Sequence, residues 1–172
     1  LSSCNDLSFI FFNCFSFDKK IEFDTSSIND LDSTFRNMNI FNSPINIDTS
    51  NVTEMQNMFQ GSKNFNQPIT FDTSKVQKMN AMFRSCDVFK QSLASLNIES
   101  VTDLRNFLFS TDINISGTTT NYDETLNSFA NQNVQPNLNF NGGNSKYSSV
   151  GKVGRDKLIN YFGWTITDGG QV

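Results

Sequence analysis

Three aspartates recur at a fixed spacing and are the first residues whose type could do chemistry. Asp24, Asp48 and Asp72 each open an Asp-Thr-Ser triplet, and the triplets are 24 residues apart. In a regular stack of repeats their carboxylates would lie about 4.8 Å apart and would repel one another unless hydrogen-bonded or bridged by a cation. The main interpretation is that each aspartate accepts backbone N–H groups of its own turn. A calcium-binding ladder is the alternative, although the glycine-rich calcium repeat of other solenoids is absent.

The same triplets place hydroxyl groups in a second ladder. Thr25, Thr49 and Thr73 recur with the 24-residue step. One hypothesis is an exposed, flat polar face that binds a sugar, a protein or ice. The other is that these threonines cap turns and satisfy backbone groups.

Catalytic constellations are scarce in this sequence. It contains no histidine, which excludes Ser-His-Asp and Cys-His relays and histidine-based metal sites. Cys14 and Cys86 belong to one repeat column, three repeats apart, so we expect them to be about 14 Å apart, too far for a disulfide. We interpret them as small buried side chains. We therefore expect no enzyme activity and no cofactor.

Charge and hydropathy restrict the partners. Only 17% of the residues are charged and the formal net charge is −4, which argues against nucleic acid. The longest apolar stretch, Phe9 to Phe12, is too short to span a bilayer, so no transmembrane segment is expected. The sequence begins inside a repeat and without an initiating methionine, so we expect it to be part of a longer protein whose signal segment lies elsewhere.

The elements that position these ladders follow from a repeat of apolar residues. A fixed period of 20 to 50 residues is typical of solenoids, in which stacked coils bury a continuous core. Four apolar columns keep the 24-residue step: Phe17, Phe41, Phe65 and Phe89; Ile21, Ile45, Ile69 and Leu93; Phe11, Phe35, Phe59 and Phe83; and Leu7, Leu31, Met55 and Met79.

Each unit is expected to hold a short strand and a short helix. Ile45-Asn46-Ile47 alternates apolar and polar residues, and Pro44 before it favours an extended entry. Apolar residues from Val52 to Phe59 recur at spacings of three and four, which predicts a helix of about two turns. Ser50 is placed to cap that helix.

The repeat changes toward its C-terminal end. Val101-Thr102-Asp103-Leu104 follows the pattern one residue late, which indicates an insertion near Ser95. We place four to five units in residues 1–112, where at least three are needed for mutual burial. Residues 113–172 are interpreted as a capping region continuous with the solenoid, as a stack needs to cover its last apolar face.

Two elements of the capping region can be predicted. Leu158, Ile159 and Phe162 lie on one side of a helix that Gly163 can end. After it, the alternating residues of Trp164-Thr165-Ile166 indicate a final strand.

The units resemble the repeat of BspA-like surface proteins, a branch of the leucine-rich repeats. The resemblance rests on Asp48-Thr49-Ser50, Val52-Thr53, Met55, Met58-Phe59 and Phe65-Asn66-Gln67-Pro68, in that order, and covers about residues 5 to 110. The segment Gly163-Trp164-Thr165-Ile166-Thr167-Asp168-Gly169-Gly170 is similar to the one that commonly closes such arrays.

Together these features predict an α/β repeat fold. We expect a right-handed solenoid of the leucine-rich-repeat type, with short parallel strands, short helices and a C-terminal α/β cap. The resemblance implies a cell-surface or extracellular recognition or adhesion module that binds a protein or glycan. The alternative is a structural subunit of a surface layer, appendage or filament that assembles with copies of itself.

Overall fold

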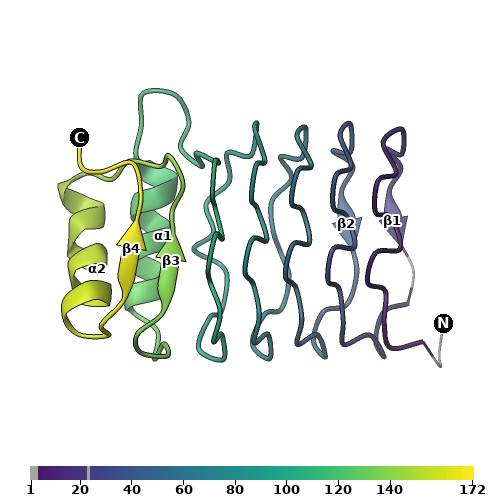
Figure 1. Cartoon of the computed structure of the whole chain (residues 1–172), viewed down its shortest axis with the longest axis horizontal. Coiled ribbons are helices and arrows are strands. Elements are labelled where there is room, and N and C mark those ends of the chain that lie inside the picture. The colour runs from purple at the N-terminus through teal and green to yellow at the C-terminus, as the bar shows by residue number, and fades with distance from the viewer. Residues whose placement is uncertain (1–3, 23) are drawn as a thin grey trace.

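The molecule is a row of coils that lie side by side along its longest axis. The structure is a computed structural model and describes residues 4–22 and 24–172. The coils run from the N-terminal end to a pair of helices at the C-terminal end (Figure 1). Its named elements are β1 (Ile21–Glu22), β2 (Ile45–Asn46), α1 (Thr120–Ala130), β3 (Asn139–Asn141), α2 (Ser149–Asn160) and β4 (Thr165–Thr167).

One parallel ladder runs through all the coils. Single bridges join Asp6 to Asp30, Asp30 to Glu54, Glu54 to Lys78 and Lys78 to Asp103. A further bridge joins Leu104 to Phe140 in β3, which pairs in parallel with β4. We call this series the long ladder. Since Lys78 pairs with Asp103 rather than with residue 102, the expected one-residue insertion before that coil is confirmed.

A second, shorter parallel pairing lies elsewhere on the coils. Ile21 of β1 pairs with Ile45 of β2, and Glu22 pairs with Asn46. Ile21 is buried and Ile45 is partly buried, as the apolar and polar alternation predicts.

The short helix expected from Val52 to Phe59 is not formed, and that prediction is wrong. Asn57 has φ 55°, which breaks a right-handed helix. Its N–H donates to the Asn80 carbonyl of the next coil at 2.9 Å instead of to its own turn. Tight turns nevertheless leave both Val52 and Phe59 fully buried, so the apolar spacing is satisfied without a helix. Ser50 does not cap; its N–H donates to Asp48 Oδ1 at 2.9 Å.

Stacked phenylalanine rings form the centre of the coils. The Phe59 ring lies 5.5 Å from those of both Phe35 and Phe83, with nearly parallel planes. The Phe65 ring lies 4.1 Å from Phe59, and the column continues to Phe89 at 6.0 Å. Such offset stacks add to the free energy gained by burial. The phenylalanine columns are therefore the core that holds one coil against the next.

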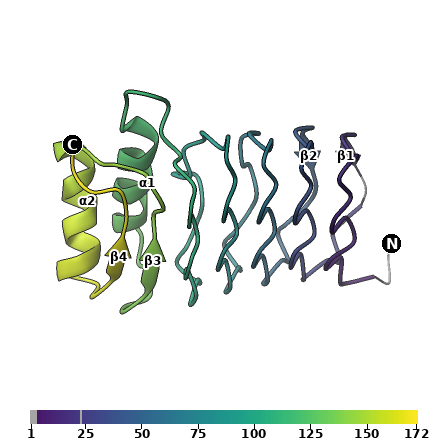
Figure 2. The same cartoon turned by 45° about the horizontal axis from the view of Figure 1, so that its top comes forward.

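The cap is built on two helices that approach closely. Helices α1 and α2 lie side by side in both views (Figures 1 and 2). Gly154 faces the α1 backbone, where a Cβ atom would lie only 2.6 Å from the Leu126 carbonyl oxygen. Asp123 of α1 accepts hydrogen bonds from the backbone N–H of Ser148 at 2.9 Å and from its hydroxyl at 2.6 Å, immediately before α2. The two helices are thus positioned by backbone packing and by this carboxylate.

The C-terminal helix and strand predicted from the sequence are present as α2 and β4. Leu158 is fully buried in α2, while Phe162 lies just beyond its end. Gly163 has φ 73°, a conformation that suits glycine after a helix. Immediately after β4, Asp168 accepts hydrogen bonds from the Tyr122 hydroxyl and from Arg155 Nε at 3.1 and 2.8 Å. This network joins α1, α2 and the segment after β4.

Candidate binding face

The threonine ladder is not an exposed face, and that hypothesis is wrong. Thr25, Thr49 and Thr73 are only 1%, 3% and 1% exposed. The Thr25 hydroxyl donates to the Asp48 carbonyl and the Thr73 hydroxyl to the Asn97 carbonyl, both at 2.8 Å. These hydroxyls join adjacent coils because the turn directs them inward, where a polar group needs a partner.

The aspartate ladder lies at exposed turns. Asp24, Asp48 and Asp72 accept the backbone N–H two residues ahead, in Ser26, Ser50 and Ser74, at 3.0, 2.9 and 3.0 Å. Hydrogen bonds from these serines hold the pKa of all three carboxyls below its usual value. Within residues 4–22 and 24–172, no group of three or more Asp, Glu, Cys or His side chains could hold a metal ion. Each carboxylate therefore serves its own turn.

The cysteines are free thiols in this structure. Cys86 is fully buried, and burial raises the pKa of its thiol far above the usual value. A thiol held protonated in this way is a poor nucleophile. Cys4 and Cys14 are partly buried.

The long ladder presents a continuous polar face. No residue type repeated along the sequence marks its positions. Buried Leu31, Met55 and Met79 point inward from it, so the residues on either side point outward by strand alternation. Those outward residues are all exposed or half-buried and define what we call the ladder face: Asp6, Ser8, Asp30, Asp32, Glu54, Gln56, Lys78, Asn80, Asp103, Arg105, Asn139, Asn141, Thr165 and Thr167.

Carboxylates outnumber cations on the ladder face. Lys78 pairs with Glu54 at 3.2 Å, and Arg105 pairs with Asp103 at 2.7 Å. Asp30 lies among other acids. Burial raises its carboxyl pKa, and the charges of Asp6, Asp32 and Glu54 raise it further. The first three coils therefore carry excess negative charge.

Two acceptor atoms in the middle of the ladder face have no hydrogen-bond partner in the described part of the chain. They are Glu54 Oε2 and Gln56 Oε1, and both atoms are buried. A buried polar atom without a partner costs about 1–3 kcal/mol. Because neither atom is exposed, a ligand on the surface would reach them only if the two side chains changed rotamer.

The ladder face is hollowed where the last coil meets the cap. One depression of about 220 Å³ is lined by Arg105, Phe140 and Thr167 among others, and a second of about 200 Å³ by Thr102, Asp103 and Asn137 among others. Amide, hydroxyl and guanidinium groups thus surround the β3 end of the face. The face could have been found from the sequence only as the positions flanking the inward Leu and Met column, because its residue types differ from coil to coil.

Comparison with known proteins gives a family but no described function. Neither the curated proteins nor the solved structures contain a match to this chain. No helix in the described ranges is both long and apolar enough to cross a membrane. A family model described as "Mycoplasma protein of unknown function, DUF285" matches residues 5–122, which include every coil and the start of α1. The chain therefore belongs to the DUF285 family.

Proposed function

We propose that this chain is a non-catalytic recognition or adhesion module of the cell surface that binds a protein or glycan through the ladder face. The observation that carries the proposal is the continuity of that face. Its outward polar residues follow one parallel ladder from Asp6 to Thr165 without an apolar interruption. Repeat proteins commonly use such extended surfaces for binding.

The chemistry of the face favours a partner rich in hydrogen-bond donors. Excess carboxylates in the first three coils attract cationic or hydroxyl groups. A partner with lysine, arginine or sugar hydroxyl groups would complement these carboxylates.

The extracellular placement rests on the similarity of the repeat to BspA-like surface proteins. That similarity, together with the parallel coils and the 24-residue step, also supports interpreting the stack as a right-handed solenoid of the leucine-rich-repeat type with an α/β cap. On this interpretation the coils provide a rigid support and the ladder face provides specificity.

An array of extracellular-matrix proteins and glycans, probed with the purified chain, tests the proposal. The variant D6N/D32N/E54Q removes three charges from the ladder face, and D24N/D48N/D72N is a matched control that removes three charges from the turns. We expect the wild-type chain to bind as a monomer and the ladder-face variant to lose at least about tenfold in affinity, with the control within about twofold. Equal losses in both variants contradict the proposal. Absence of binding together with concentration-dependent assembly of the wild-type chain would indicate the structural role instead.

A further inference from the structure

A separate hollow lies where the regular coils give way to the cap. It has a volume of about 690 Å³ and is lined by Asp112, Asn114, Ile115, Ser116, Gly117, Thr118, Thr119, Thr120, Asn144, Lys146 and Val172. None of these residues belongs to the ladder face. Its size falls within the range of small-molecule sites in proteins, about 300–1,000 Å³.

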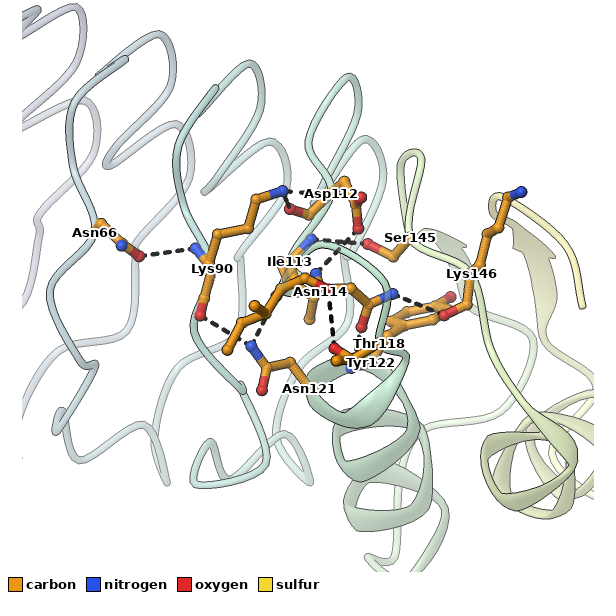
Figure 3. Close-up of polar contacts among 11 residues, drawn as sticks. Asn66, Lys90, Asp112, Ile113, Asn114, Thr118, Asn121, Tyr122, Ser145 and Lys146 are labelled. Atoms are coloured by element: carbon orange, nitrogen blue, oxygen red, sulfur yellow. Dashed lines mark hydrogen bonds and ion pairs between the residues drawn. The ribbon is translucent and has the colours of Figure 1, made fainter. Parts of the chain in front are cut away.

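The floor of the hollow is held by a hydrogen-bond network (Figure 3). Asn114 is 4% exposed, and its backbone N–H donates to Asp112 Oδ1 at 3.0 Å. Its side chain donates to the Lys146 carbonyl at 2.8 Å and accepts from the Tyr122 backbone N–H at 3.1 Å. The buried side-chain amide of Asn114 thus links the loop to the start of α1 and to the segment before α2.

Neighbouring contacts fix the two ends of the loop, at Ile113 and Asn121, while residues 115–118 between them are exposed. The Asn121 amide donates to the carbonyls of both Lys90 and Ile113. The Ile113 backbone N–H donates to the Ser145 hydroxyl at 3.1 Å. A site whose frame is already ordered loses less entropy when a ligand binds.

The lining combines groups that suit a neutral ligand with many hydroxyls. Asp112 and Lys146 bring opposite charges to the lining, and Lys90 Nζ lies 3.8 Å from Asp112 Oδ2. Asp112 Oδ1 accepts from Asn114 and Oδ2 faces Lys90, which leaves further lone pairs of the carboxylate for a ligand. Ser116 and Asn144 offer both donors and acceptors. The side chain of Ile115 is 59% exposed and provides an apolar surface beside these polar groups.

We propose that this hollow binds a neutral saccharide of one to a few units, such as the end of a glycan chain. Adjacent hydroxyls of the sugar would bind the Asp112 carboxylate, and its C–H face would lie against Ile115. A phosphate or sulfate group would meet the Asp112 carboxylate there as well as the cations Lys90 and Lys146, so binding of an anion is the outcome that the test must exclude. Because the hollow shares no residue with the ladder face, either site can fail without the other.

The test uses the full chain with an array of neutral and anionic oligosaccharides and, separately, with inorganic phosphate followed by NMR. S116W places a large side chain in the exposed loop and fills the hollow, and N160W places the same side chain at the exposed end of α2 as a matched control. We expect neutral oligosaccharides to bind the wild-type chain, and S116W to lose at least about tenfold in affinity, with N160W within about twofold. D112N is expected to weaken the same binding, while D6N/D32N/E54Q leaves it unchanged.

Three results overturn the proposal. One is that no neutral oligosaccharide binds the wild-type chain. Another is that binding is the same in S116W and N160W. The third is that only anionic sugars or phosphate bind and that K146A abolishes this binding, which would assign the hollow to an anion.

Discussion

Replacement of Phe59 by alanine tests whether the coils are held together by their ring columns. Phe59 is completely buried, and four rings surround it: Phe35 and Phe83 at 5.5 Å, Phe65 at 4.1 Å and Phe71 at 6.4 Å. A buried Phe→Ala change costs about 3–5 kcal/mol through lost burial and a residual cavity. We expect the upper half of that range, because the neighbouring coils are fixed by ladder hydrogen bonds and cannot collapse into the cavity.

Urea denaturation at constant pH measures this cost, with circular dichroism as one probe and fluorescence of Trp164 as the other. Trp164 is the only tryptophan and is buried in the cap. Phe15→Ala is the matched control, since Phe15 is 52% exposed, and we expect a cost of about 1 kcal/mol or less. A cost for Phe59→Ala below about 1.5 kcal/mol, or equal costs for the two variants, would refute the stacked-column account.

Further predictions concern the cap and the acidic residues. Gly154→Ala should cost roughly 1–3 kcal/mol by pushing α2 from the Leu126 carbonyl, whereas the exposed Val153→Ala should change the free energy of unfolding by less than about 0.5 kcal/mol. Burial and neighbouring acids raise the Asp30 pKa, so its ionised form costs stability once the pH exceeds that pKa; Asp30→Asn should stabilise the chain at pH 7, and the gain should vanish in acid. Serine hydrogen bonds lower the Asp48 pKa, so Asp48→Asn should destabilise at neutral pH, with the difference lost as pH falls through that pKa. Millimolar calcium should leave the thermal midpoint unchanged, because each turn carboxylate already accepts its own serine N–H.

The core was predictable from the sequence because its residues keep both type and spacing. Phe35, Phe59 and Phe83 recur every 24 residues, and all are buried in one stack. The one-residue insertion was visible for the same reason. A closely packed core position accepts few side-chain types, so each core column keeps almost the same residue type from one coil to the next.

The turn chemistry could not be derived from apolar spacing alone. A spacing of three and four residues suits a helix, but tight turns with left-handed residues such as Ser33, Asn57 and Ala81 place the same side chains inward. No glycine marks these positions, so the sequence carried no clear signal against a helix. The inward direction of Thr49 was missed because it depends on that turn geometry.

The ladder face and the hollow beside the cap could not be predicted from the sequence, for different reasons. The ladder face changes residue type at each coil, from Asp30 to Glu54 to Lys78, since solvent-exposed positions have no packing constraint to preserve identity. The hollow depends on Asn114 contacting Tyr122 and Lys146, which lie 8 and 32 residues away and outside the repeat. Helix α1 has no counterpart in the coils, so periodicity could not predict it.

The most direct test of the proposed function is a residue-resolved NMR titration of the chain with a partner identified on the array. The account predicts that amide shifts follow the ladder face across several coils, from Asp30 through Lys78 to Asn139, with little change at Asp24, Asp48 and Asp72. Shifts confined to those turn aspartates or to the outer side of α2 would contradict it.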